Sequence, residues 1–359
     1  MSQLLVSLCV CIAFFFALPL KSLAPQVAPA QTAAASPAQA GAASPAQTAG
    51  ASAVVADAAE FRAEPSPERL ARGKYLVTAV AHCFECHGDS DFGAGLGQPK
   101  PGTEGAGQII RDEDNDYKLL PDAVVVPNIT PDKETGAGTW ADWQFERAIR
   151  HGIGHDGRKL IDFMPYAFFR SFTDEDVASV IVYIRSLPAV KHPLPKMRVN
   201  FEVQTDMLPQ MEPVLPPDAS EQLRHGWYLT RVAQCSGCHT PYDEKGSPVA
   251  DKMFGGGLHL KGDWGDVVTP NITCHPSGIS HYDVNTFIKT IRTGRSSAGV
   301  RDLATIMPYS YFRRMSDEDL SSIFAFIHSV KPVFHEVDNS EPATYCVICK
   351  QKHGLGDRN

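Results

Sequence analysis

The stretch that organises the chain is Cys83-Phe84-Glu85-Cys86-His87, and it returns as Cys235-Ser236-Gly237-Cys238-His239. The spacing Cys-x-x-Cys-His is typical of a c-type haem attachment site. Two thiols one helical turn apart can each form a thioether with a haem vinyl group, and the next residue, histidine, then lies beneath the iron as its proximal ligand. Zinc binding and thiol–disulfide exchange are the alternative uses of such a pair. Two copies inside one longer pattern favour haem.

The longer pattern is an internal duplication. Pro127-Asn128-Ile129-Thr130 returns as Pro270-Asn271-Ile272-Thr273, and Met164-Pro165-Tyr166 returns as Met307-Pro308-Tyr309. A period this long is the size of a domain rather than of a solenoid repeat. The predicted segments are a domain over 65–196, a connector over 197–214, a second domain over 215–337 and a tail over 338–359.

Each copy is expected to open with a helix. Helices over 68–81 and 221–233 lead into the two cysteine motifs, and each carries a glycine one turn in, Gly73 and Gly226. Because a glycine inside a helix costs about 1 kcal/mol relative to alanine, its presence in both copies predicts that another helix crosses closely there.

Each copy is also expected to close with a helix. The closing helices begin at Thr173 and Ser316, and an aspartate follows each three residues later, as in a capping box. Apolar residues then recur at helical spacing, and Pro188 and Pro332 end the helices. These stripes are expected to face the core and are assigned no chemistry.

Met164 and Met307 are the predicted second axial ligands of the two irons. They occupy the same place in the two copies. A thioether there gives six-coordinate iron with a raised reduction potential, which suits electron transfer. The following proline restricts the methionine to extended conformations, which helps to present the sulfur. Flexible core filling is the alternative role. The histidines without a counterpart in the second copy are assigned to the surface or the core: His82, His151, His155 and His192.

On these motifs the chain resembles class I cytochrome c domains, in particular the multi-haem cytochrome c subunits of bacterial membrane-bound alcohol and gluconate dehydrogenases. The likeness covers about 65–195 and 218–335. It implies an all-α fold of two tandem class I cytochrome c domains, two covalently bound haem c groups with His/Met ligation, and electron transfer. The chain departs from that family in having two haem motifs where those subunits usually have three, and Cys274-His275-Pro276 where the first copy has a Pro-Asp turn.

The amino-terminal residues predict export. Residues 4–20 form an almost uninterrupted apolar run, so 1–30 is expected to be a signal peptide or a retained membrane anchor. Residues 31–64 are rich in Ala, Pro, Gln, Ser and Gly and are expected to form a disordered, flexible tether. The predicted location is the periplasm or the outer face of the cytoplasmic membrane. The net charge of -8 shows no excess of basic residues of the kind that binds nucleic acid.

Three of the nine cysteines remain outside the haem motifs and the apolar run: Cys274, Cys346 and Cys349. A disulfide within the tail, or between the tail and Cys274, suits an oxidising compartment. There are two alternatives: a third haem at Cys346 with Lys350 as ligand, and a small metal site that includes His353.

The predicted function is that of a dihaem electron carrier rather than an enzyme. Its partners would be a periplasmic or membrane dehydrogenase as donor and a cytochrome or oxidase of the respiratory chain as acceptor. The enzyme alternative is an oxidoreductase of the thiosulfate-dehydrogenase type, which needs one haem with an exchangeable ligand, and Cys274 is the candidate for that ligand. A tethered structural or sensing haem module is the third hypothesis.

Overall fold

The computed structural model describes residues 61–92, 95–111, 123–197, 215, 218–243, 246–262, 265–296 and 302–338, with three short strands beyond them. All of these belong to one compact unit within residues 49–359. We call residues 61–197 the first half and residues 215–338 the second half. Several predicted features lie outside the described residues: the export segment, nearly all of the tether and the connector, and the cysteines Cys346 and Cys349.

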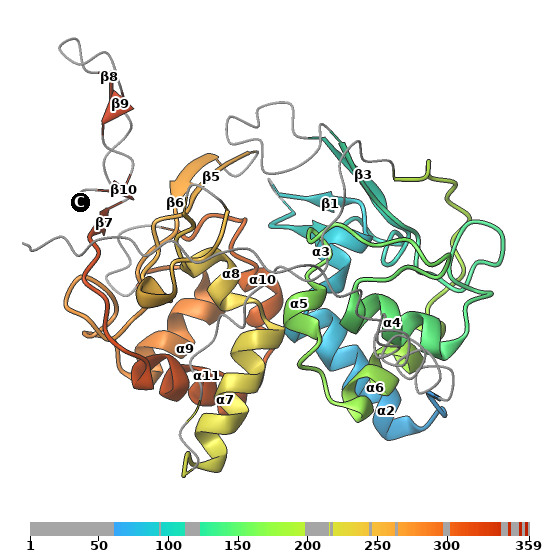
Figure 1. Ribbon diagram of the computed structural model, residues 1–359, viewed down its shortest axis with the longest axis horizontal. Helices are drawn as coiled ribbons and strands as arrows, with labels where there is room; N and C mark the ends of the chain where they lie inside the picture. The colour runs from blue at the N-terminus through green and yellow to red at the C-terminus, as the bar shows by residue number, and fades with distance from the viewer. Residues whose placement is uncertain are drawn as a thin grey trace, which may run out of the picture. The chain divides into compact units, whose positions relative to one another are not determined.

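The first half is built from short helices and two hairpins (Figure 1). In chain order its elements are α2 Pro67–Tyr75, the π-helical turn η1 Leu76–Val80, α3 Cys83–His87, β1 Ser90–Asp91, β2 Gln98–Pro99, β3 Gln108–Arg111, β4 Ala123–Val126, α4 Asp142–His151, α5 Tyr166–Phe169 and α6 Asp174–Arg185. β1 pairs with β2 and β3 with β4, both antiparallel, and Gln108 lies opposite Val126.

The second half carries corresponding helices in the same order. Its elements are α7 Glu221–Val232, α8 Cys235–His239, the 3-10 turn η2 Ala250–Lys252, β5 His259–Gly262, β6 Gly265–Val268, α9 Val284–Thr293, α10 Tyr309–Phe312, α11 Asp317–Ser329 and β7 Val337–Asp338. The strands beyond are β8 Thr344–Tyr345, β9 Lys352–His353 and β10 Gly356–Asp357. The described residues are mostly helical, as predicted, but the two-stranded ladders were not predicted.

The glycine in each opening helix marks a close helix crossing. A Cβ atom on Gly73 of α2 would lie 1.9 Å from the carbonyl oxygen of Ser179 in α6, and one on Gly226 of α7 would lie 1.9 Å from that of Ser322 in α11. Figure 1 shows the two helix pairs side by side. The prediction from the repeated glycine is therefore confirmed: each glycine lets two helix backbones touch where any side chain would separate them.

The opening helix of the first half contains one residue more than that of the second. Cys83 comes ten positions after Gly73, whereas Cys235 comes nine positions after Gly226. The extra residue coincides with the π-helical turn η1, while α7 stays α-helical over its whole length. A π-turn widens the helix locally by one residue. Both the crossing glycine and the cysteine motif can therefore keep their orientation despite the different spacing.

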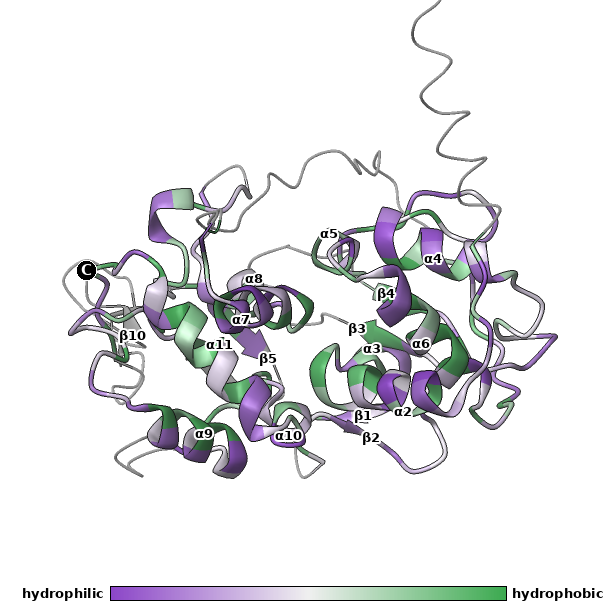
Figure 2. Ribbon diagram, turned by 90° about the horizontal axis from the view of Figure 1, so that it is seen from below, coloured by the Kyte–Doolittle hydropathy of each residue, from purple (hydrophilic) through white to green (hydrophobic). Residues whose placement is uncertain are grey.

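Side chains of the two halves share one hydrophobic cluster. Val177 and Ile181 of α6 and Leu320 and Phe326 of α11 are buried in it, as is Leu229 of α7. Figure 2 shows hydrophobic stretches along α6 and α11. The predicted caps are present, because the hydroxyls of Thr173 and Ser316 accept from the third backbone amide of their helices at 3.1 and 3.0 Å. Among the described residues, no helix is long and apolar enough to cross a membrane.

Candidate functional site

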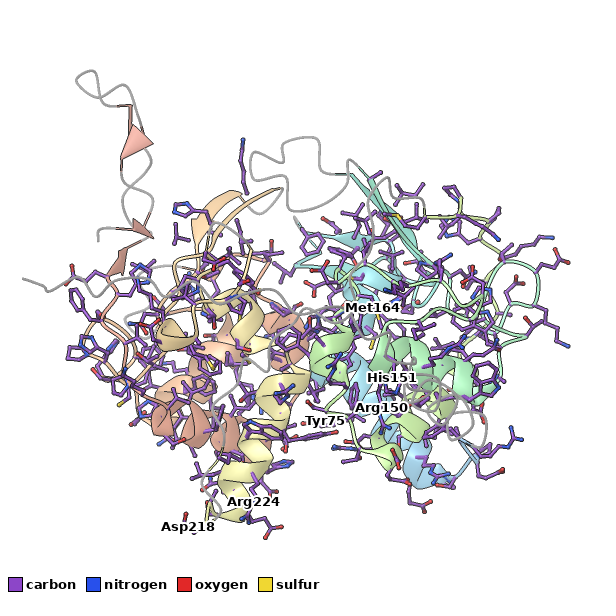
Figure 3. The ribbon with its side chains drawn as sticks, in the orientation of Figure 1. Tyr75, Arg150, His151, Met164, Asp218 and Arg224 are labelled. Atoms are coloured by element: carbon purple, nitrogen blue, oxygen red, sulfur yellow. The ribbon has the colours of Figure 1, made fainter. Side chains whose placement is uncertain are left out.

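The structure brings the four predicted ligands of the first half to one cavity. Cys83, Cys86 and His87 of α3 and Met164, in the turn before α5, line a space of about 310 Å³. Figure 3 shows where Met164 lies in the first half. The rest of the lining is largely apolar and includes Val126, Ile129, Phe145, Ile149, Phe169 and Val180. An apolar cavity with two cysteines, a histidine and a methionine on its wall suits a flat hydrophobic group that is bound covalently and through a metal.

The predicted proximal histidines are held by a proline carbonyl. His87 is buried, and its Nδ1 lies 2.9 Å from the carbonyl oxygen of Pro127. His239 repeats this contact at 2.8 Å from Pro270. Because a carbonyl oxygen can only accept, Nδ1 carries the proton and Nε2 is left with a free lone pair for a metal. Burial lowers the pKa of both rings, against the opposing effect of the carbonyl, which also favours the neutral ligand form.

The chemistry of the four motif thiols argues against the zinc alternative. Burial raises the pKa of Cys83 and Cys235 to about 12 and that of Cys238 to about 11, and it raises that of Cys86 as well. Zinc sites bind thiolates, which need electropositive surroundings. Among the described residues, no group of three or more His, Cys, Asp or Glu side chains could hold a metal ion. Cys83 and Cys86 line the apolar cavity as neutral thiols, and this setting fits thioether formation better than zinc binding.

The methionine turns of the two halves have the same backbone contacts. The amide of Met164 donates to Ile161 at 3.1 Å, and that of Met307 donates to Ala304 at 3.0 Å. The tyrosine ring two residues later packs on the glycine after α4 or α9, where a Cβ on Gly152 or Gly294 would come within 2.6 or 2.3 Å of it. Both glycines have positive φ. Each tyrosine ring can therefore pack there only because the residue beneath it is glycine, and this packing holds the methionine turn in place.

An asparagine holds the proline carbonyl loop in each half. Asn128 Oδ1 accepts from the amide and hydroxyl of Thr130 at 2.9 and 2.7 Å, and its Nδ2 donates to Val190 at 2.8 Å. Asn271 makes the same three contacts with Thr273 and Val333, at 2.9, 2.8 and 2.8 Å. The repeated Pro-Asn-Ile-Thr thus positions the histidine. Its repetition was visible in the sequence, but its role was not.

The unmatched histidines have varied surroundings. His155 is exposed and stacks on Trp140 with a 4.4 Å ring separation, at the cavity wall. His151 is 44% exposed and lies 3.4 Å from Glu146, and His192 Nδ1 lies 3.0 Å from the carbonyl of Ala106. His82 pairs with Glu85 at 2.6 Å and is only 13% exposed.

The second half carries its predicted ligands in the corresponding elements. Cys235, Cys238 and His239 form α8, and Met307 precedes α10 and packs against the core. Cys274 is partly exposed and forms no disulfide with another described cysteine. The predicted pairing with Cys346 or Cys349 involves residues outside the described part of the chain and stays a prediction.

Comparison with known proteins agrees with this geometry. The family model described as cytochrome c matches residues 70–188. The chain contains a cytochrome c domain. It is 31% identical over 288 residues to the fructose dehydrogenase cytochrome subunit of Gluconobacter japonicus, covering 74% of this chain and 54% of that protein. It is 30% identical over 233 residues to the cytochrome c subunit of a quinone alcohol dehydrogenase of Gluconacetobacter polyoxogenes, covering 57% and 47%.

A third relative is matched over more of its own length. It is the diheme cytochrome c-type protein of Cereibacter sphaeroides, which is 23% identical over 220 residues and is covered to 72% of its length, with 58% of this chain aligned. The chain spans about half the length of the two dehydrogenase subunits. The predicted resemblance to cytochrome c subunits of dehydrogenases is confirmed, and none of these relatives favours the thiosulfate-dehydrogenase alternative.

Proposed function

We propose that the chain is a dihaem electron carrier, with tandem cytochrome c domains over 65–196 and 215–337. The observation that carries the proposal is the repeated histidine site, in which a buried ring donates Nδ1–H to a proline carbonyl and keeps Nε2 free. The first of these rings lines a cavity with two cysteines and a methionine. The diheme relative supports a count of two haems.

The two sets of ligands would each hold one haem. Cys83 and Cys86 would bind the first haem covalently, with His87 and Met164 as axial ligands. Cys235 and Cys238 would bind the second, with His239 and Met307. When bound, each haem c supplies a one-electron couple. The chain's own residues would supply both ligands to each iron, and the apolar side chains of the first cavity would keep water out of it, which suits electron transfer without binding of a small molecule.

The relatives support a place beside a dehydrogenase. Two of them are cytochrome subunits of fructose and alcohol dehydrogenases. We infer that this chain accepts electrons from a dehydrogenase and passes them to a further cytochrome or oxidase, outside the cytoplasm. Covalent haem attachment and the apolar run over residues 4–20 are what support export.

Haem content and carbon monoxide binding test this function together. The full chain, produced with a c-type haem maturation system, should have an intact mass that corresponds to two covalent haems. The reduced protein should show little change in absorption under carbon monoxide, because methionine fills each sixth position. A mass that fits one or three haems would contradict the count. Rapid carbon monoxide binding by one haem would contradict the carrier and favour a catalyst.

A further inference from the structure

The two haem attachment turns touch each other. His82 immediately precedes Cys83, and Gln234 immediately precedes Cys235. Both residues adopt the left-handed conformation, with φ of 40° and 60°. Their side chains meet across the halves, with His82 Nε2 3.4 Å from Gln234 Nε2. Because His82 Nδ1 faces Glu85 Oε2 at 2.6 Å, its Nε2 is the atom that can accept from the Gln234 amide.

The contact lies at the wall of the first cavity. His82 and Gln234 both line that cavity, so a residue of the second half contributes to the site of the first. The turn that carries one set of cysteines is thus in direct contact with the turn that carries the other.

The short helix after each methionine packs on the other half's attachment turn. A Cβ on Gly237 of α8 would lie 3.1 Å from Cζ of Phe168 in α5. In the reciprocal contact, the His82 ring lies 6.0 Å from that of Tyr311 and 5.6 Å from that of Phe312, both in α10. In each direction an aromatic residue of one half's short helix thus lies against the attachment turn of the other half.

A second pair of reciprocal contacts fixes the halves in this arrangement. The Tyr75 hydroxyl donates to Asp319 of α11, and the Tyr228 hydroxyl donates to Asp176 of α6. Figure 3 shows Tyr75 extending from the first half. Burial raises the pKa of Tyr75 to about 12 and also raises that of Tyr228, so both phenols stay protonated donors near neutral pH. Polar contacts at two places thus keep the turns together.

We propose that electrons pass between the two haems across the contact between His82 and Gln234. This inference rests on the proposed function. Cys83 and Cys235, whose thioethers would each hold one haem edge, directly follow His82 and Gln234, so a route through bonds from one haem to the other crosses a single gap, between these two side chains. Electron tunnelling falls steeply with distance and is faster through bonds than through gaps. The step moves one electron from a ferrous to a ferric haem and needs no other reactant.

The experiment uses the full holoprotein with Met164→Ala, in which the first haem can bind carbon monoxide. In the half-reduced, carbon monoxide-bound state, a light flash releases the ligand, and the electron then redistributes to the second haem. The change in absorption of each haem with time after the flash gives the rate of electron transfer between the two haems. Adding Gln234→Asn should slow this rate severalfold, because asparagine tolerates the left-handed backbone but falls short of His82. Gln234→His, made instead of Gln234→Asn, should keep much of the rate seen with glutamine at this position.

The matched control is Arg314→Gln. It removes other contacts between the halves, from Arg314 to Gln98 Oε1 at 2.6 Å and to the Thr78 carbonyl at 3.2 Å, and leaves His82 and Gln234 themselves unchanged. It should leave the rate unchanged. All variants should keep two haems by mass and the absorption spectrum and potential of the second haem. An unchanged rate in Gln234→Asn, or equal slowing in Arg314→Gln, would overturn the route. A haem count other than two, or failure of Met164→Ala to bind carbon monoxide, would instead contradict the proposed function.

Discussion

The two halves keep the same scaffold around their histidines and differ in the charges beside their cysteines. Each half has the crossing glycine, the proline carbonyl on the histidine and the asparagine clamp. The first attachment turn, however, holds a buried pair of Glu85 and His82, where the second has uncharged Gly237 and Gln234. The difference indicates that ligand geometry is constrained in both halves, whereas the electrostatic setting of each haem is free to vary.

The contacts between the halves show the same division. Asp176 accepts from Arg72 and Tyr228, whereas Asp319 accepts from His225 and Tyr75. The tyrosine and the aspartate are the same in both places, and only the nitrogen-bearing partner differs. A guanidinium thus supports one contact and an imidazole the other. The two proposed haems are therefore expected to have different reduction potentials.

The largest effect is expected from the methionines. Met164→Ala should open the sixth position of the first haem and give it carbon monoxide affinity, while the second keeps its spectrum; Met307→Ala should do the converse. Replacement of either by histidine should keep six-coordination and lower that haem's potential, because a thioether favours ferrous iron relative to imidazole. Absorption and redox titrations check this. If Met307→Ala left both haems six-coordinate, the halves would differ in ligation, and Cys274 would be the ligand to test.

The crossing glycines come next. Gly73→Ala and Gly226→Ala should each destabilise the holoprotein by about 3 kcal/mol, because the new methyl group meets a backbone carbonyl that cannot turn away. Denaturant unfolding followed by far-UV circular dichroism measures the loss. Ala71→Ser, at an exposed site of the same helix, should change stability by less than about 0.5 kcal/mol. A much smaller cost at one glycine would show that its helix pair can separate.

A smaller loss of folding stability is expected when the asparagine clamps, Asn128 and Asn271, are removed. Asn128→Ala or Asn271→Ala should cost about 1–3 kcal/mol, because each leaves buried backbone and hydroxyl groups without a partner. The histidine of that half should also bind its iron less rigidly, which a broader low-spin electron paramagnetic resonance signal would reveal. The exposed Asn285→Ala is the control and should be almost neutral. Equal signals in wild type and Asn128→Ala would rule out a positioning role for the clamp.

The smallest effect concerns acid stability. Burial acts to raise the pKa of Asp176, but hydrogen bonds from Arg72 and Tyr228 outweigh it, so the pKa lies below its ordinary value. The stability that this carboxylate contributes is therefore present above the unfolded-state pKa of about 3.9 and is lost as the pH falls through the folded-state value. Tyr228→Phe should cost about 1 kcal/mol near neutral pH. Below about pH 4 the difference from wild type should shrink, as unfolding curves across the range would show.

Much of the site could be predicted because its residues repeat. Cys83, Cys86, His87 and Met164 were all singled out in the sequence, and the structure brings them to one cavity, while their roles as haem ligands stay predictions. The glycine crossings were also predicted, because a glycine that is costly in a helix needs a reason to be there twice. The short hairpins were not predicted: strands such as β4 are four residues long and pair with strands whose sequence pattern is equally short.

The contacts between the halves could not have been predicted from the repeats. His82 seemed a surface or core histidine because the second copy has no histidine at that place, yet it meets the equivalent residue, Gln234. The capping aspartates were predicted to serve their own helices. In the structure their carboxylates accept from tyrosines of the other half. A repeat shows which residues recur, as the tyrosines and aspartates do, but it does not show whether a residue's partner lies in its own copy or in the other.

The π-helical turn η1 bears on the history of the chain. It coincides with the single residue by which the first opening helix exceeds the second. A one-residue insertion or deletion after the proposed duplication would account for it, because a helix can absorb such a change as a local bulge without rotating the cysteine motif beyond it. An alignment of the two copies should therefore place its gap within Leu76–Val80, and shortening the chain by one residue there should yield an ordinary α-helical turn.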